Sequence, residues 1–187
     1  MKIIALLGKS RVGKDTAATI FSEAFGFPIV RLASPVKDAV HVLFDIPRGH
    51  LDSYQKEVID PRYGKTPRDL MVWLTSVIQR DFSKDFFFRR LRERFPSDIQ
   101  GIVIPDVRFA HDVSMLRDHG ATIIKITRNN APVCHAHEDG IDALSGHLWL
   151  KNDDTLEDFE MEVSRTAEFL RAGFLRDGIF RRGGQGS

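Results

Sequence analysis

Residues 8–16, Gly-Lys-Ser-Arg-Val-Gly-Lys-Asp-Thr, directly follow the apolar run at residues 3–7. This is the spacing of a P-loop, a turn whose backbone N–H groups surround the phosphates of a nucleotide. Gly8 and Gly13 permit the tight turn, and Lys14 opens a helix whose N-terminal dipole faces the same point. Apolar residues then recur at helical spacing. The pattern therefore predicts a strand, a loop and a helix around a nucleoside triphosphate.

The residue after this lysine departs from the strict motif, which has Ser or Thr there to bind Mg²⁺. Asp15 takes that place and Thr16 follows. Because Mg²⁺ favours carboxylate oxygen and keeps several waters, either side chain can hold it directly or through water. The sequence leaves this choice open. The residues expected to bind the nucleotide here are Gly8, Lys9, Ser10, Arg11, Val12, Gly13, Lys14, Asp15 and Thr16.

Size and composition fit one domain with a substantial core. The chain has 187 residues, 42% of them hydrophobic, and we expect a single domain over residues 1–172 with a flexible tail at 173–187. The 27 basic and 26 acidic residues balance, so bulk charge neither favours nor excludes nucleic acid. One cysteine, Cys134, excludes an internal disulfide. No apolar run is long enough to span a membrane, which predicts a cytoplasmic protein without a membrane partner.

Short β-rich apolar runs alternate with helical periodicities, which is typical of an α/β protein with helices on both faces of a parallel sheet. The sequence predicts a five-stranded, mostly parallel sheet. Strands are expected near residues 2–7, 28–32, 101–104, 121–127 and 147–151, and helices, besides the one after the loop, near 34–43, 67–82, 83–95, 109–119 and 155–171. The aperiodic segments 45–66 and 128–147 are expected to be long surface loops that flank the site.

Charged residues follow two of the predicted strands. Asp106 ends the apolar run at 102–105, where P-loop proteins place the acid that holds Mg²⁺ or its water shell. Arg108 is expected to face the same crevice and bind a phosphoryl oxygen, the alternative being a surface ion pair. Arg128 ends the next strand, where an arginine can neutralise charge that develops during phosphoryl transfer; a solvated arginine is the alternative.

A histidine-rich segment resembles a metal site without its spacing. His135, His137 and Glu138 lie close together, but no second Cys or His cluster accompanies them. We therefore do not expect zinc.

Aromatic and basic residues alternate within the predicted helix at 83–95. Residues 86–88 are all phenylalanine, and Arg89, Arg90 and Arg92 follow. Such a segment can stack bases and bind phosphates, or it can be a packing helix with at least one phenylalanine in the core. The sequence leaves both interpretations open.

Taken together, the motifs resemble the deoxynucleoside monophosphate kinases of bacteriophages and their P-loop kinase relatives. The similarity runs in order through nearly the whole chain, with GKSRVGKDT at 8–16, LASPVKDAV at 32–40, TPRDLM at 66–71, IPDVR at 104–108, GATIIKITR at 120–128, HAHEDG at 135–140 and LKNDDTLEDF at 150–159. The resemblance implies a P-loop kinase fold, ATP and Mg²⁺, and a host cytoplasm if a phage encodes the chain.

The resemblance also implies roles for residues on the donor side. Lys14 and the loop amides would hold the ATP phosphates, Arg128 would close over them, and Asn152 would lie near adenine. The expected catalytic residues are Lys14, Asp106, Arg108 and Arg128, and the expected metal ligands are Asp15, Thr16 and Asp106.

On the acceptor side, the resemblance implies that Arg68 and Arg108 bind the acceptor. Lys37 and Asp38 lie where the family lines the acceptor pocket, and Glu138 matches a carboxylate of the loop on that side. These positions predict a deoxynucleotide as the second substrate.

Departures from the family concentrate in this acceptor half. Leu-Thr-Ser at 74–76 stands where the family tends to have Leu-Gly-Thr, and His137 replaces a small hydroxyl residue. These departures favour a changed acceptor. The resemblance to a related branch of the family implies 5-hydroxymethyl-deoxyuridine in phage DNA, as in thymidine hypermodification, and this is the favoured acceptor. Free deoxynucleoside monophosphate, which would become the diphosphate, is the alternative, and a non-catalytic ATP-binding module is another.

A DNA acceptor would need further residues. Its hydroxymethyl group benefits from a carboxylate that accepts the proton, and Asp38, Asp106 and Glu138 are equal candidates. Its backbone needs cations, which the predicted helix and the tail offer as Arg89, Arg90, Arg92, Arg181 and Arg182. The sequence does not reveal the oligomeric state.

Overall fold

The computed structural model describes residues 1–96, 98–129 and 140–176. The chain divides into two compact units, one made of Met1–Val30 and Asp98–Ser187 and the other of Arg31–Ser97. The expectation that residues 1–172 form one domain stays a prediction beside this division.

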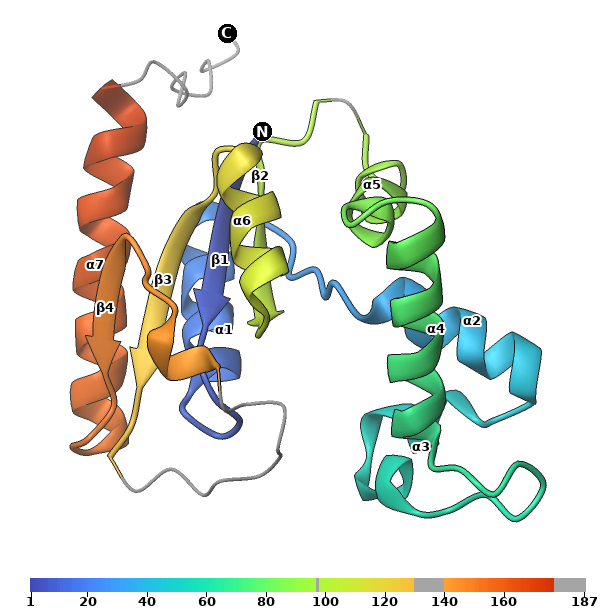
Figure 1. Cartoon of the computed structure of the whole chain (residues 1–187). Helices are drawn as coiled ribbons and strands as arrows, with labels where there is room; N and C mark the ends of the chain where they lie inside the picture. The colour runs from blue at the N-terminus through green and yellow to red at the C-terminus, as the bar shows by residue number, and fades with distance from the viewer. Residues whose placement is uncertain (97, 130–139, 177–187) are drawn as a thin grey trace, which may run out of the picture. The chain divides into compact units, whose positions relative to one another are not determined.

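A parallel sheet forms the centre of the first unit. Its strands, in the order β2-β1-β3-β4, are β1 (Lys2–Leu7), β2 (Gly101–Val107), β3 (Thr122–Thr127) and β4 (Leu148–Lys151). All three pairings are parallel. Nearly every residue of β1, β2 and β3 is buried, as expected for strands covered on both faces. The predicted α/β class with a parallel sheet is confirmed (Figure 1).

The predicted fifth strand at residues 28–32 is wrong, and the sheet has four strands. Only Ile29 forms a bridge, to Val103, with Val30 N donating to Val103 O at 2.8 Å and Val103 N donating to Pro28 O at 3.0 Å. Pro28 has no N–H to extend the pairing. After Val30 the chain turns, with Ser34 N donating to the carbonyl of residue 31, and enters a helix.

Helices cover both faces of the sheet. Figure 1 shows α6 (Ala110–Asp118) in front of the sheet and α1 (Lys14–Phe25) and α7 (Leu156–Arg176) behind it. The α1 and α7 helices pack on each other and on the strands through the main core cluster, which includes Phe21, Phe27 and Phe159. Four residues of the predicted tail, 173–176, belong to α7, and residues 177–187 lie outside the described part of the chain.

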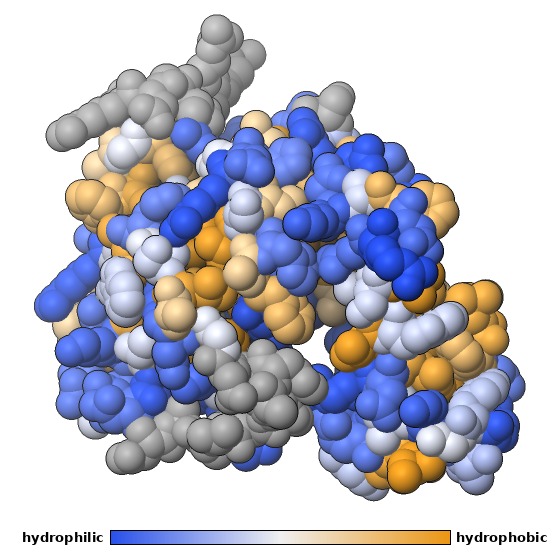
Figure 2. Space-filling model, viewed as in Figure 1, coloured by the Kyte–Doolittle hydropathy of each residue, from blue (hydrophilic) through white to orange (hydrophobic). Residues whose placement is uncertain are grey.

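The second unit consists of helices around a smaller core. They are α2 (Ser34–Phe44), α3 (Arg48–Asp52), the 3₁₀ helix η1 (Tyr54–Glu57), α4 (Pro67–Asp81) and α5 (Phe86–Arg92). The core joins side chains of α2 and α4 with Leu51 of α3 and Phe87 of α5. The expected loop at 45–66 therefore contains two short helices, one of which contributes to the core. Figure 2 shows apolar residues gathered over α2, where Val42 and Leu43 are exposed.

Burial decides between the two interpretations of the phenylalanine run. Phe87 and Phe88 are buried, and Phe86 packs against the core of the second unit. Phe87 and Phe88 are therefore used for packing and are not available for stacking on bases, and Phe86 is half-buried against the same core. The interpretation of α5 as a packing helix is supported.

Gly101 gives a test of the packing beneath the sheet. A Cβ on Gly101 would lie 2.3 Å from the Phe27 ring, which is buried and stacks on Phe25 with ring centroids 5.3 Å apart. We expect Gly101→Ala to lower the free energy of unfolding by about 1–3 kcal/mol, because the ring cannot move freely. Urea unfolding followed by circular dichroism measures this.

Gly173→Ala is the matched control. Gly173 lies within α7, and a Cβ there would meet nothing within 4 Å. Alanine should therefore stabilise the helix by about 0.5–1 kcal/mol. Equal stability of the Gly101→Ala variant and the parent protein would contradict the proposed packing.

Candidate functional site

The loop between β1 and α1 depends on two glycines. Gly13 has φ 102°, and a Cβ there would lie 2.6 Å from Nδ2 of Asn152 and 2.9 Å from the Phe159 ring. A Cβ on Gly8 would lie 2.4 Å from the carbonyl oxygen of Ile126. A larger residue at Gly8 would require the backbone of Ile126 to shift, and one at Gly13 would have to displace the side chains of Asn152 and Phe159. Arg11, with φ 63°, completes the turn.

Lys14 is the first residue of α1 and is buried. Its Nζ donates to the carbonyl oxygen of Gly8 at 2.7 Å and also to that of Lys9. The ammonium group therefore lies inside the curve of the loop. This is the placement that a lysine needs to reach anionic groups bound by the loop amides.

Asn152 fixes the loop from the other side. Its buried Nδ2 donates to the carbonyl oxygen of Val12 at 3.0 Å, and its backbone N donates to Thr127 O at 2.8 Å. The turn before α7 is thus tied both to the loop and to β3. The role of Asn152 near adenine stays a prediction.

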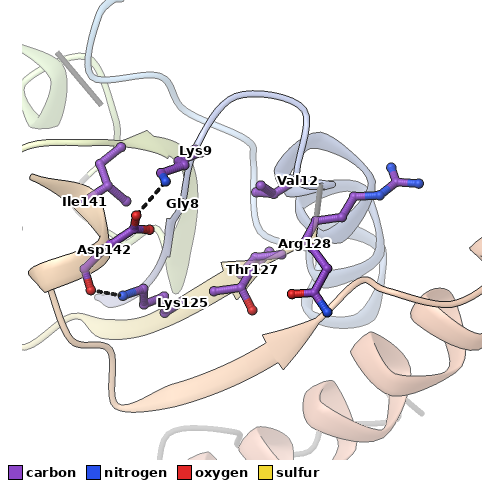
Figure 3. A pocket seen from close by; sticks show the side chains of 10 residues that line it. Gly8, Lys9, Val12, Lys125, Thr127, Arg128, Ile141 and Asp142 are labelled. Carbon is purple, nitrogen blue, oxygen red and sulfur yellow. Dashed lines mark hydrogen bonds and ion pairs between the residues drawn. The ribbon is translucent and has the colours of Figure 1, made fainter. Parts of the chain in front are cut away.

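A pocket of about 240 Å³ lies beside the loop (Figure 3). Its lining comes from the loop, the end of β3 and the short 3₁₀ helix η3 (Ile141–Ala143), and comprises Gly8, Lys9, Val12, Lys125, Ile126, Thr127, Arg128, Asn129, Ile141 and Asp142. In Figure 3 the Arg128 side chain extends away from Lys9 and Asp142. Arg128 makes no hydrogen bond or ion pair with the residues that the structure describes, so its guanidinium can bind a ligand.

Two residues of this pocket were not found by sequence reasoning. Lys125 is 3% exposed in the middle of β3, and its Nζ donates to the carbonyl oxygens of Asp142 and Leu144 at 2.8 and 2.7 Å. Asp142 forms an ion pair with Lys9 at 2.5 Å. Burial lowers the pKa of Lys125 from its ordinary value of 10.5, an effect that the Asp142 carboxylate opposes. A lysine within an otherwise apolar strand was the available signal.

Strand register places Asp106 next to the loop. Ala5 pairs with Ile104 and Leu7 with Val107, so Pro105 and Asp106 together oppose one residue of β1. This irregularity falls where proline lacks an N–H for the ladder. Asp106 is half-buried beside the end of β1, directly before the glycine loop begins.

Arg108 and two of the predicted metal ligands, Asp15 and Thr16, lie at or just before the starts of helices. Arg108 is half-buried just before α6, and its backbone N donates to Asp112 Oδ2 at 3.4 Å. In the first turn of α1, Asp15 is exposed and Thr16 is half-buried. The choice between Asp15 and Thr16 as the metal ligand, and the role of Asp106, stay predictions.

The described part of the chain contains no cluster of metal-binding side chains. Outside residues 97, 130–139 and 177–187, no group of three or more His, Cys, Asp or Glu side chains is placed to hold a metal ion. Cys134, His135, His137 and Glu138 lie outside the described residues. The expectation that these residues do not bind zinc therefore stays a prediction.

Two of the predicted acceptor residues belong to one network of ion pairs in the second unit. Lys37 Nζ lies 2.5 Å from Asp52 Oδ1, and Arg48 bridges Asp52 at 2.7 Å and Asp38 at 3.1 Å. Arg94 binds the other oxygen of Asp38 at 3.1 Å. We call these five residues the acceptor-side network. Its three cations outnumber its two carboxylates, which leaves it net positive.

Arg68, another predicted acceptor residue, pairs with a carboxylate outside this network. Arg68 binds Glu57 with two nitrogens, Nε at 2.8 Å and Nη2 at 2.5 Å from Oε1. The pair fastens η1 to the first turn of α4, whose start is closed by a capping box between Thr66 and Asp69. Arg68 therefore has a structural partner in the second unit.

The first unit has the architecture of a mononucleotide-binding α/β protein. A parallel strand leads into a glycine-hinged loop, a buried lysine starts the next helix, and an acidic side chain ends the neighbouring strand. No helix in the described part of the chain is both long and apolar enough to cross a membrane.

Comparisons with known proteins define the family. The sequence model of the deoxynucleotide monophosphate kinase family matches residues 66–163, more than half of the chain. The chain therefore belongs to the deoxynucleotide monophosphate kinase family, and it is a kinase.

Two curated relatives match over most of their length. An Acanthamoeba polyphaga mimivirus protein named "Putative deoxynucleotide monophosphate kinase" is 28% identical over an alignment of 184 residues. The alignment covers 87% of this chain and 94% of the relative. The deoxynucleotide monophosphate kinase of Enterobacteria phage T4 is 22% identical over an alignment of 241 residues. The alignment covers 91% of this chain and 100% of the phage protein. A solved structure, named a putative kinase from Chloroflexus aurantiacus J-10-fl, has 13% identity and a TM-score of 0.49, covering 91% and 97% of the two chains.

Titration of Asp52 gives a test of the acceptor-side network. Partial burial raises the pKa of Asp52, but the hydrogen bond and charge of Lys37, with the charges of Arg48 and Arg31, outweigh burial. The pKa lies below its ordinary value of 3.8. The ionised form therefore favours the folded state above that value, and its contribution is lost as the pH falls below it.

We expect the parent protein to be more stable than the Asp52→Asn variant at pH 6. The difference in unfolding free energy should shrink as the pH falls below 3.8, and thermal or urea unfolding from pH 6 to pH 2.5 measures it. Asp154→Asn, at an exposed position in the first unit, controls for general loss of charge. A difference that does not change with pH would show that the network does not depend on ionised Asp52.

Proposed function

We propose that this kinase transfers the γ-phosphate of ATP, bound with Mg²⁺, to the 5′-phosphate of a deoxynucleoside monophosphate. An acceptor phosphate oxygen forms a bond to the γ-phosphorus while the bond to the β–γ bridging oxygen breaks, and ADP leaves. The observation that carries the proposal is the buried Lys14 within its glycine-hinged loop, in a chain of this family. The membership also favours an enzyme over a non-catalytic ATP-binding module.

The donor-side roles follow from charge and position. Phosphoryl transfer needs little covalent chemistry from the protein, so catalysis comes from positioning and from stabilising charge on the transferred group. Lys14 and the loop amides would bind the phosphates, and Arg128, with its guanidinium unengaged among the described residues, would add charge to them. Arg108 would serve the same purpose from the start of α6. Mg²⁺ held by Asp15, Thr16 or Asp106 would supply further neutralisation.

The acceptor-side roles rest on an excess of positive charge. A monophosphate is nearly dianionic at neutral pH and is best bound by arginine or lysine. The acceptor-side network is net positive and contains Lys37 and Asp38. We propose that it binds the acceptor together with Arg68 and Glu138, whose placement lies outside the described residues. The phosphate is already ionised, so this reaction needs no general base.

5-Hydroxymethyl-deoxyuridine in DNA is the second candidate acceptor, and the structure lends it less support. The departures at 75 and 76 serve the helix itself, because the hydroxyls of Thr75 and Ser76 donate to the carbonyls four residues earlier at 2.8 Å. Arg89 and Arg90 are paired with Asp85 and Glu93. Thr75, Ser76, Arg89 and Arg90 thus have local structural roles. Arg181 and Arg182 lie outside the described residues.

An assay with two acceptors tests the proposal. The protein is incubated with γ-labelled ATP and Mg²⁺ and with either the free deoxynucleoside monophosphates or a duplex that contains 5-hydroxymethyluracil. We expect label in a deoxynucleoside diphosphate. Label in the duplex alone would replace the proposed acceptor with DNA, and label in neither would reject the proposed transfer.

Lys14→Met tests the role of the loop lysine. Loss of a charge that stabilises the transferred group should lower kcat/KM for ATP by about 10²–10³-fold, because such donors act in a water-poor site. Lys84→Met, which removes an exposed lysine between α4 and α5, is the control and should retain the parent rate. A Lys14→Met enzyme with the parent rate would remove the loop from the mechanism.

A further inference from the structure

Lys125 fixes η3 to the sheet. It lies between buried isoleucines of β3, and its ammonium group is held by the two carbonyl oxygens at Asp142 and Leu144 and lies 4.6 Å from the centre of the Trp149 ring. A buried ammonium group needs such partners because burial alone disfavours its charge. The carbonyls that satisfy it belong to one short turn, so the turn is bound to a fixed point on the sheet.

Other contacts hold the same segment in place. Ile141 is buried, and Arg117 of α6 donates to the carbonyl oxygen of Ser145 at 2.7 Å. A Cβ on Gly146 would lie 2.8 Å from the backbone N of Lys125, which shows how closely this chain runs along β3. The segment around η3 is therefore anchored to β3 and to α6, and its exposed side chains project from a rigid base.

Asp142 extends from this base to the nucleotide-binding loop. Its carboxylate is 68% exposed and lies 2.5 Å from the ammonium group of Lys9, whose side chain is 26% exposed (Figure 3). The main-chain carbonyl of the same Lys9 accepts a hydrogen bond from Lys14. Lys9 is thus held at both ends, by Asp142 through its side chain and by Lys14 through its backbone.

A carboxylate beside a bound triphosphate is unfavourable unless its charge is compensated. Two like charges 4 Å apart repel by about 1 kcal/mol even in water, so an unpaired Asp142 beside a triphosphate would weaken nucleotide binding. The ion pair with Lys9 removes that repulsion. It also sets the position of the second residue of the loop, whose amides are expected to bind the phosphates.

We propose that Asp142 is a positioning residue for the nucleotide-binding loop, acting through Lys9, and that Lys125 is the positioning residue for Asp142. The inference rests on the proposed function for the identity of the nucleotide. It predicts that these residues set affinity for ATP and leave the handling of the acceptor unchanged, because Lys125 and Asp142 bind partners within the first unit, whereas the acceptor-side network belongs to the second.

Nucleotide binding tests this without turnover. Isothermal titration with a non-hydrolysable ATP analogue and Mg²⁺ gives Kd for the parent protein, Asp142→Asn, Lys9→Met and the double variant. An ion pair of this exposure supports an effect of about fivefold. We expect Asp142→Asn to raise Kd by that factor in the parent and to have no further effect in the Lys9→Met background. Asp118→Asn, at the exposed end of α6, is the matched control.

Steady-state kinetics separates positioning from a structural effect. Asp142→Asn should raise KM for ATP and leave KM for the monophosphate and kcat within twofold. Lys125→Met keeps the bulk under Trp149 and removes both hydrogen bonds, so it should raise KM for ATP in the same way.

Three results would overturn the inference. Tighter analogue binding by Asp142→Asn would show that the carboxylate acts only by repelling phosphate. An unchanged Kd would show an ordinary surface ion pair, and the same loss in the Lys9→Met background would show that Asp142 does not act through Lys9. Failure of the parent protein to bind the analogue would instead reject the proposed function, so the two failures are distinguishable.

Discussion

The close approach of the backbone to its neighbours at Gly8 and Gly13, in the loop between β1 and α1, determines much of the first unit. At Gly8 the chain passes against the carbonyl of Ile126, and at Gly13 it passes against Asn152 and Phe159. These contacts bring the end of β1, the end of β3 and the start of α7 to one place. Any side chain at the two glycines would force them apart. The site is therefore a consequence of how tightly the strands and helices pack around the loop.

The two units use charged residues differently. In the second unit, exposed or half-exposed side chains pair with each other, as in the acceptor-side network and in the Arg68–Glu57 pair. Such pairs contribute little stability individually, so a ligand phosphate can compete for their cations. In the first unit, Lys14 and Lys125 are buried and bound to main-chain carbonyls. Their ammonium groups are fixed in position before any nucleotide arrives.

Local patterns predicted the strands, most helices and the glycine loop. Strands buried on two faces need apolar residues, and the positive φ in the turn needs glycine at position 13. The strand at 28–32 was predicted wrongly, since a short apolar run does not show whether its hydrogen bonds can extend past Pro28. The Lys9–Asp142 pair joins residues 133 positions apart, and pairing at that separation leaves no local pattern. The charge of Lys125 in an apolar strand was a signal in the sequence, because its ammonium group binds the main chain at Asp142.

The cost of burying Lys125 argues for a role beyond stability. A hydrophobic residue at this position of β3 would not need two carbonyl partners. Replacement of buried charges by apolar residues is often neutral or stabilising, so a buried ammonium group is weak evidence for a gain in stability. The ammonium group instead orients η3, because its N–H groups donate to the carbonyl oxygens of Asp142 and Leu144. That orientation places the Asp142 carboxylate against Lys9 in the loop between β1 and α1.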